Sequence, residues 1–200
     1  MSGEYLPRVM AVLGAETGRR SEPAEWLKIE SDLGFALPDD YKALVDAYAP
    51  VKLNGHLVLN HPATPRWNLG EYIRDTSRAW SEVPWGEDVD GDPRIVLNLD
   101  ELEFGTLRGL TPIASADSGQ TVFLAADPKG LRPLLFIEDG DGEFFEYSMS
   151  FSEWLYRYLA GEDMAGPNSS YFYPGPVELE SRPMSQGGEV VRWYGPDRGV

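Results

Sequence analysis

Two short runs of alternating acids have the spacing of a cation-binding loop. They are Asp88-Val-Asp90-Gly-Asp92 and Asp139-Gly-Asp141-Gly-Glu143. A calcium loop of that kind needs Gly at its sixth position and a bidentate acid at its twelfth. The first run has Pro93 and Leu99 there, and the second has Phe144 and Ser150. We therefore interpret both runs as solvated acidic turns and expect no metal and no cofactor.

Nucleophilic and metal chemistry have few residues available. The chain has two histidines, His56 and His61, and no Cys. On a strand their spacing of five places them on opposite faces, which disfavours a ligand pair. Ser115 and Asp117 lie outside any Gly-x-Ser-x-Gly elbow, and two histidines leave few ways to assemble a Ser-His-Asp triad. Acid pairs are plentiful, so glycosidase-type acid–base catalysis stays open. We favour a protein that is not an enzyme.

Acidic residues gather in two segments. Residues 82–103 hold eight acids and one base, and residues 138–146 hold five acids and no base. If the two segments share one rim, they form a negative surface that steers a cationic partner; a dispersed acidic surface is the alternative. Trp85 has no apolar partner at helical spacing, so we expect an exposed contact anchor there. The tail motif Tyr171-Phe172-Tyr173-Pro174 is a second candidate. The expected partner-binding residues are Trp85, Glu87, Asp88, Asp90, Asp92, Glu101, Glu103, Asp139 and Asp141.

Composition restricts the class of partner. A formal net charge of −16 disfavours nucleic acid and anionic membranes and favours a basic protein, although acidity that only maintains solubility is the alternative. The length of 200 residues and the 42% hydrophobic content fit one main domain. An acid near the N-terminus argues against an export signal, and no run approaches the roughly 18 apolar residues of a membrane span. We expect a cytoplasmic protein.

The elements that would position these residues follow from the apolar spacing. Residues 21–48 predict a hairpin of two amphipathic helices, separated by Gly34 and Pro38. Further helices are expected before Gly14, over 68–83 and from 150 to 159. Strands are expected over 55–60, 94–99, 110–116, 121–126, 131–138 and 143–147. The last three form an antiparallel meander with turns at 127–130 and 139–142.

The pattern weakens after residue 161, where Pro and Gly recur. A short strand at 190–194 is the only element expected there. We therefore divide the chain into an N-terminal extension (1–20), one domain (21–161) and a Pro/Gly-rich, peripheral C-terminal tail (162–200).

Several of these segments resemble the SUKH superfamily of Smi/Knr-like domains. The matching residues are Trp26-x-x-Ile29-Glu30-x-x-Leu33-Gly34-x-x-Leu37-Pro38-x-Asp40-Tyr41-Lys42-x-Leu44, then Leu110-x-Pro112-Ile113-Ala114, Asp127-Pro128-x-Gly130 and Ser150-Phe151-x-x-Trp154-Leu155. The resemblance implies an α+β fold, with helices packed on a mainly antiparallel curved sheet. It also implies a binding role. Many bacterial members are immunity proteins that neutralise polymorphic toxins, often nucleases, while the fungal regulator of cell-wall assembly suggests the alternative of a housekeeping scaffold without a toxin partner.

Overall fold

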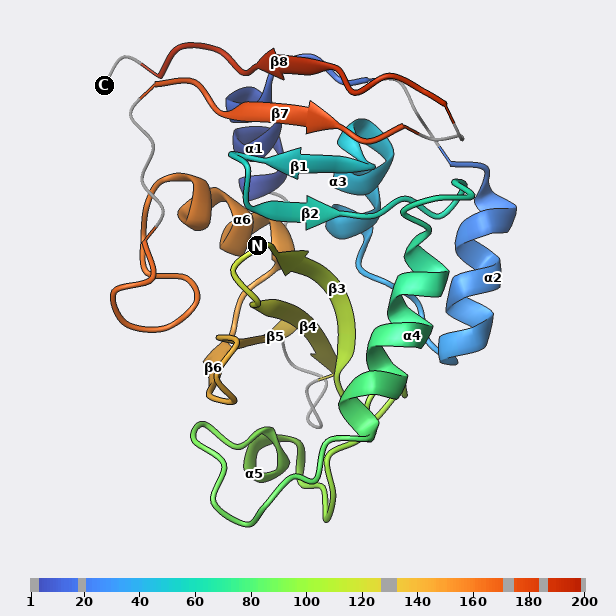
Figure 1. Cartoon of the computed structure of the whole chain (residues 1–200), viewed down its shortest axis with the longest axis vertical. Helices are drawn as coiled ribbons and strands as arrows, with labels where there is room; N and C mark the ends of the chain where they lie inside the picture. The colour runs from blue at the N-terminus through green and yellow to red at the C-terminus, as the bar shows by residue number, and fades with distance from the viewer. Residues whose placement is uncertain (1–3, 18–20, 127–132, 171–174, 184–186, 199–200) are drawn as a thin grey trace.

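An antiparallel sheet runs through the whole molecule, with most helices packed against one face (Figure 1). The computed structural model describes residues 4–17, 21–126, 133–170, 175–183 and 187–198. Within these residues the sheet has eight strands in the order β6-β5-β4-β3-β2-β1-β7-β8. The strands are β1 (Val51–Leu53), β2 (Leu57–Leu59), β3 (Thr111–Ala116), β4 (Thr121–Ala126), β5 (Pro133–Glu138), β6 (Phe144–Tyr147), β7 (Glu178–Ser181) and β8 (Arg192–Tyr194). The predicted α+β class is confirmed.

Capping residues mark the start of several helices. Six lie within the described residues: α1 (Tyr5–Leu13), α2 (Pro23–Leu33), α3 (Asp39–Tyr48), α4 (Leu69–Ser81), α5 (Pro93–Leu97) and α6 (Phe151–Leu159). In α4 the side chain of Asn68 accepts from the backbone N–H of Glu71, and in α6 that of Ser150 accepts from Glu153. These bonds satisfy backbone donors that a helix N-terminus otherwise leaves without partners.

The predicted hairpin of α2 and α3 is confirmed. A reciprocal capping box between Glu22 and Glu25 starts α2, and Gly34, with φ of +78°, ends it in the left-handed conformation. The side chain of Glu30 then joins the two helices, because its Oε1 accepts from the backbone of Leu37 at 2.9 Å and from Lys42 Nζ at 3.0 Å. The signature residues around the turn therefore support the fold.

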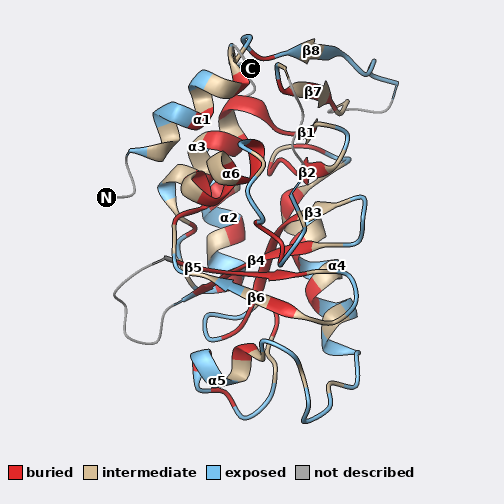
Figure 2. Cartoon of the chain, turned by 90° about the vertical axis from the view of Figure 1, so that its left-hand side faces the viewer, coloured by how far each residue is buried: buried red, intermediate tan, exposed pale blue. Residues whose placement is uncertain are grey.

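One face of the sheet packs against α1, α2, α3 and α6. Figure 2 shows the buried residues concentrated between these helices and the strands. Tyr41 and Trp154 are fully buried there. The Tyr41 hydroxyl donates to the carbonyl of Ile113 on β3 at 2.9 Å, and its ring meets Phe151 edge-on with centroids 5.1 Å apart. The aromatic residues at helical spacing therefore build the core.

The opposite face of β4 and β5 is covered by a long excursion of the chain, residues 82–110. Phe123 and Phe136 point to this side and form a separate apolar cluster with Leu97 and Phe104 from the excursion. Trp80, at the end of α4, packs beside them with its ring 5.6 Å from that of Phe123. The excursion, which holds the eight acids of residues 82–103, is therefore anchored on the sheet by an apolar underside.

Residues 94–99 are helical in part, not a strand as we expected. Asp92 caps α5 by accepting from the backbone N–H of Arg94, Pro93 occupies the first turn, and Asn98 ends the helix with φ of +54°. The apolar run Ile95 to Leu97 has a strand-like composition, but the Asp-Pro start signal and the left-handed Asn decide the conformation.

The segment after residue 161 supplies two strands, of which only β8 was anticipated. β7 pairs with β1 on one side and with β8 on the other, and Val177 and Leu179 are fully buried. This part of the segment is therefore integral to the sheet, although its Pro and Gly residues mask the alternation of apolar residues. The division of the chain at residues 20 and 161 stays a prediction.

Candidate partner-binding site

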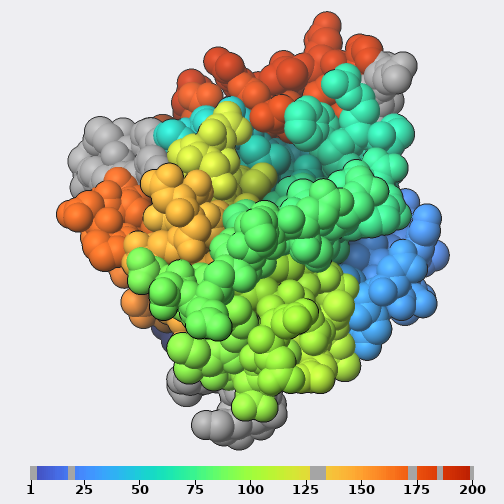
Figure 3. Space-filling view, turned by 60° about the horizontal axis from the view of Figure 1, so that its bottom comes forward, coloured from blue at the N-terminus to red at the C-terminus, as the bar shows by residue number. Residues whose placement is uncertain are grey.

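The two acidic segments meet at one end of the molecule. The loop that follows α4 lies against the turn between β5 and β6, and together they form an open hollow of about 580 Å³. We call it the acidic hollow. Its lining residues are Val83, Pro84, Trp85, Gly86, Asp88, Val89, Asp90, Asp139, Asp141, Gly142 and Glu143. Figure 3 shows the surface formed by the 82–110 excursion beside α4. Five carboxylates from two distant parts of the sequence therefore share one rim.

Backbone contacts fix the loop to the sheet. The backbone N–H of Phe144 donates to the carbonyl of Asp90 at 2.9 Å. Gly91 has φ of +69°, and a Cβ atom there would lie only 1.7 Å from the carbonyl oxygen of Phe144. Glycine is required at this position both by its conformation and by the approach of the two backbones.

Acidic side chains of the β5–β6 turn stabilise this turn on the other side of the hollow. Asp139 Oδ1 accepts from the backbone of Asp141 at 2.9 Å and of Glu143 at 3.2 Å. Glu138 is buried, and its Oε1 accepts from the backbone of Gly142 at 2.8 Å. Burial raises the pKa of Glu138, backbone donors from Gly142 and Gly140 oppose this, and the neighbouring Asp139 and Asp141 add to the rise.

Trp85 forms an aromatic wall of the hollow, but it is not the freely exposed anchor that we expected. Its side chain is partly buried, and its ring stacks on Trp80 at 5.5 Å with an interplanar angle of 10°. Its Nε1 donates to the carbonyl of Trp80 at 3.1 Å. The apolar cluster beneath the excursion attracts the ring, a contact that the local sequence does not reveal. The ring is therefore held in one orientation at the edge of the hollow.

Only some of the expected contact residues line the hollow. Trp85, Asp88, Asp90, Asp139 and Asp141 line it together. The remaining expected residues do not line it. Glu87 and Glu101 are exposed elsewhere on the excursion. Asp92 caps α5 and pairs with Arg94 at 2.8 Å, and Glu103 accepts from Thr106 at 3.0 Å.

The sequence analysis did not select Glu143, Val83 or Val89, which also line the hollow. Glu143 lies two residues after Asp141 in the same acidic run, so its position in the turn points to the same rim. Val83 and Val89 lie on either side of Trp85 and supply apolar wall. Val83 was expected at the end of the helix over 68–83, with its side chain on the apolar face, and Val89 has no periodic pattern to mark it. The motif at 171–174 lies outside the described residues, as does the turn at 127–130.

The residues considered for metal or nucleophilic chemistry have structural contacts. His61 is buried, its Nε2 lies 3.3 Å from Ser21 Oγ, and its Nδ1 accepts from the backbone of Ala63 at 3.1 Å. Asp117 pairs with Lys52. No group of three or more His, Cys, Asp or Glu side chains suited to a metal ion occurs in the described part of the chain. None of the described helices has the length and apolar character that a membrane crossing requires.

The fold and the hollow together define an α+β domain. A helix hairpin packs on one face of its antiparallel sheet, and an acidic loop packs on the opposite face of the sheet. Residues 21–157 match the model of the SMI1 / KNR4 family (SUKH-1), which is more than half of the chain. The protein belongs to this family. No curated protein matches the chain. The helix hairpin and α6, which carry the sequence resemblance, lie within the matched range or overlap its end.

Proposed function

We propose that this protein is a non-enzymatic, cytoplasmic immunity protein that binds a toxin domain and occludes its active site. The partner in this proposal is a basic polymorphic toxin, with a nuclease as the expected type, and no cofactor takes part. The observation that carries the proposal is the acidic hollow, in which carboxylates from two distant acidic segments meet around Trp85. Family membership supports a binding role of this kind.

The electrostatics of the hollow suit a basic partner. Clustered carboxylates raise the local concentration of a cationic protein and speed its encounter. On a nuclease, the same carboxylates would occupy positions that otherwise hold substrate phosphates. The proposal thus explains why a chain of net charge −16 places two acidic segments side by side.

The apolar wall suits a stable contact. Interfaces commonly combine an aromatic anchor near their centre with a charged, solvated rim. Trp85 has a fixed ring orientation because it is stacked on Trp80, so little side-chain entropy is lost when a partner covers it. Asp88 and Asp90 flank this ring in the hollow and supply the rim.

Co-expression with a secreted toxin encoded beside the gene of this protein tests the proposal. We expect growth to be restored by the natural chain and a complex to form with the purified toxin domain. A triple variant, Asp88→Asn, Asp90→Asn and Asp141→Asn, should protect poorly while remaining folded. If no toxin gene adjoins, and basic toxin domains are neither bound nor inhibited, the immunity proposal is wrong and the scaffold alternative is favoured.

A further inference from the structure

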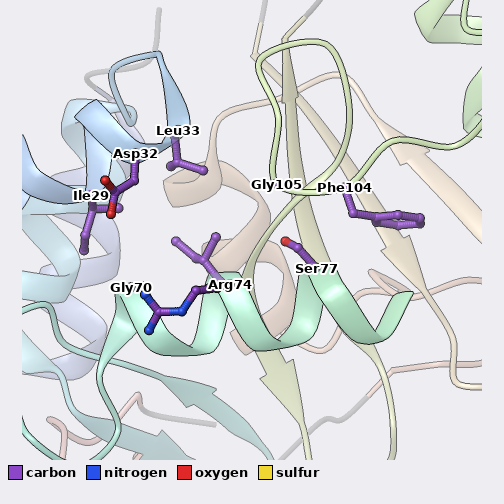
Figure 4. Close-up of a pocket in the computed structure, with 9 residues that line it drawn as sticks. Ile29, Asp32, Leu33, Gly70, Arg74, Ser77, Phe104 and Gly105 are labelled. Carbon is purple, nitrogen blue, oxygen red and sulfur yellow. The ribbon is translucent and has the colours of Figure 1, made fainter. Parts of the chain in front are cut away.

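A second hollow, separate from the acidic hollow, lies over β2 and β3 on the face of the sheet opposite the helical layer. Leu57 and Leu59 of β2 point into the helical core, so Val58 between them points to the opposite face, where it pairs with Ser115 of β3. The hollow has a volume of about 480 Å³, and we call it the β2–β3 hollow. It is distinct from the groove between α2 and α4 that Figure 4 shows, because the two are lined by different faces of α4.

A buried amide without a partner faces the β2–β3 hollow. Asn60 is 4% exposed and lines the hollow, and its side chain makes no hydrogen bond within the described part of the chain. The indole nitrogen of Trp67 is unpartnered and enclosed, whereas the Asn60 amide atoms retain accessible surface. Buried polar groups are nearly always hydrogen-bonded. The Asn60 amide therefore indicates a ligand that offers it both a donor and an acceptor.

The loop before α4 gives the hollow a strained but fixed wall. Trp67 has φ of +59°, in the left-handed region that a bulky side chain rarely adopts. Its carbonyl accepts from the backbone N–H of His61 at 3.0 Å, and the guanidinium of Arg182 lies over its ring, 4.3 Å from the centroid. Strained backbone that the surrounding structure holds in place occurs preferentially at binding sites. The wall is therefore preorganised.

A carboxylate without an ion pair lines the same hollow. Glu71 is exposed in the first turn of α4, and no ion pair within the described residues engages it. The other acids of the lining, Asp75 and Asp117, each have an ion pair of their own. The Tyr72 hydroxyl donates to the carbonyl of Ala114 at 3.0 Å and so fixes α4 on β3. Glu71 thus offers a negative charge from a fixed helix.

These groups match the chemistry of one kind of partner. We propose that the β2–β3 hollow binds an extended peptide segment that carries a lysine or arginine side chain. The Asn60 amide pairs with the N–H and C=O of one residue of the segment, and the cationic side chain lies at Glu71. The net charge of −16 favours a basic segment over an acidic one. The inference does not depend on the proposed immunity function, because none of these residues lines the acidic hollow.

Titration followed by nuclear magnetic resonance tests the proposal with blocked alanine pentapeptides that differ in their central residue. We expect the peptide with a central lysine to bind saturably with Kd at or below about 1 mM, and to shift the signals of Asn60 and Trp67. The peptide with a central norleucine keeps the backbone but lacks the charge, so it should bind roughly twofold to fivefold more weakly. Absence of saturable binding by the lysine peptide and by its arginine counterpart overturns the proposal.

Variants of the protein assign the two contacts. Glu71→Gln should weaken the lysine peptide roughly twofold to fivefold and leave the norleucine peptide unchanged, because only lysine contacts the carboxylate. Glu82→Gln, at an exposed acid after the other end of α4, is the matched control and should change neither. Asn60→Leu and Asn60→Ala should weaken both peptides roughly fivefold to tenfold, because both peptides have the same backbone.

Thermal denaturation separates a binding role for Asn60 from a structural one. The amide has no hydrogen bond to lose, and leucine nearly keeps the side-chain volume, so Asn60→Leu should unfold at the same temperature as the natural chain or higher. A marked fall in the unfolding temperature of Asn60→Leu overturns the proposal. Binding of the lysine peptide that neither Asn60→Ala nor Glu71→Gln weakens also overturns it.

Discussion

At the scale of single residues, the hydroxyl of Tyr41 joins the helical layer to the sheet. The ring is fully buried, and the hydroxyl donates to the carbonyl of Ile113 at 2.9 Å. Tyr41→Phe keeps the ring contacts but leaves this buried acceptor without its donor, so we expect a loss of about 1–2 kcal/mol in the free energy of unfolding. Urea denaturation measures it. Tyr194→Phe, at an exposed hydroxyl, is the matched control and should cost under about 0.5 kcal/mol. Equal losses would contradict this role for Tyr41.

Glu138 gives the stability of the protein a specific pH dependence. Its folded pKa is raised, first by burial and further by Asp139 and Asp141. Between the usual glutamate pKa of about 4.3 and the raised value, the folded state therefore holds the proton more often than the unfolded state. Stability from this group is present at low pH and is lost as pH rises through that window.

A comparison with Glu138→Gln isolates this effect from that of the other carboxylates. Chemical denaturation of both proteins at a series of pH values gives the difference in unfolding free energy. We expect the variant to gain stability relative to the natural chain as pH rises through the window, with a constant difference above it. A difference that does not change with pH would show that the folded pKa of Glu138 is not raised.

At the scale of elements, the acidic loop depends on one glycine. Gly91→Ala places a Cβ atom 1.7 Å from the carbonyl of Phe144, so the loop must move away from β6. Gly55 has the same φ of +69°, and a Cβ atom added there would meet nothing within 4 Å, so Gly55→Ala carries the backbone strain alone. We expect Gly55→Ala to cost about 1–2 kcal/mol and Gly91→Ala clearly more. Thermal denaturation compares them, and equal costs would mean that the loop accommodates the methyl group freely.

The strand β7 should be essential for stability. Val177 and Leu179 are fully buried beside β1. A chain that ends at residue 161 loses both side chains from the core, which alone amounts to about 3–6 kcal/mol. We expect this truncation to unfold or aggregate, as circular dichroism and gel filtration would show. A chain that ends at residue 182 retains β7 and should be less destabilised; if both truncations behave alike, β7 has no special role.

The sequence predicts elements well where local signals agree. The Gly34 and Pro38 signals locate the α2–α3 hairpin, and the Gly-rich acidic turn locates the β5–β6 hairpin. The prediction from sequence fails for α5, because the apolar run at residues 95–97 fits a helix as well as a strand. The cap at Asp92 decides in favour of the helix. It also fails for β7, because the apolar residues of a short strand become apparent only once the strand pairs with β1.

The candidate site divides in the same way. The sequence alone shows that the loop after α4 and the β5–β6 turn are acidic. The structure brings Asp88 and Asp90 of the loop together with Asp139 and Asp141 of the turn. The packing of Trp85 on Trp80 could not be predicted from the sequence, because it depends on an apolar cluster formed by α4, β4 and the excursion. The groove between α2 and α4, lined by Ile29 and Ile73, could not be predicted either, since the sequence alone does not specify how these helices lie relative to each other.

At the scale of the whole molecule, the two faces of the sheet have different tasks. One face buries the helical layer that carries the family signature, and the other supports the acidic excursion at one end. This separation allows the loop residues to change without loss of the core. The central claim is that the acidic end binds a basic protein through charge.

The rate of association with the proposed toxin partner, measured at increasing salt, tests this claim most directly. Three proteins are compared: the natural chain, the triple variant Asp88→Asn, Asp90→Asn and Asp141→Asn, and a matched triple variant, Glu4→Gln, Asp39→Asn and Glu189→Gln, with acids outside the hollow. We expect the rate for the natural chain to fall roughly tenfold or more from about 50 to 500 mM salt. The hollow variant should associate slowly at low salt and depend weakly on salt, and the matched variant should resemble the natural chain. Equal rates and equal salt dependence for the two variants would contradict the account.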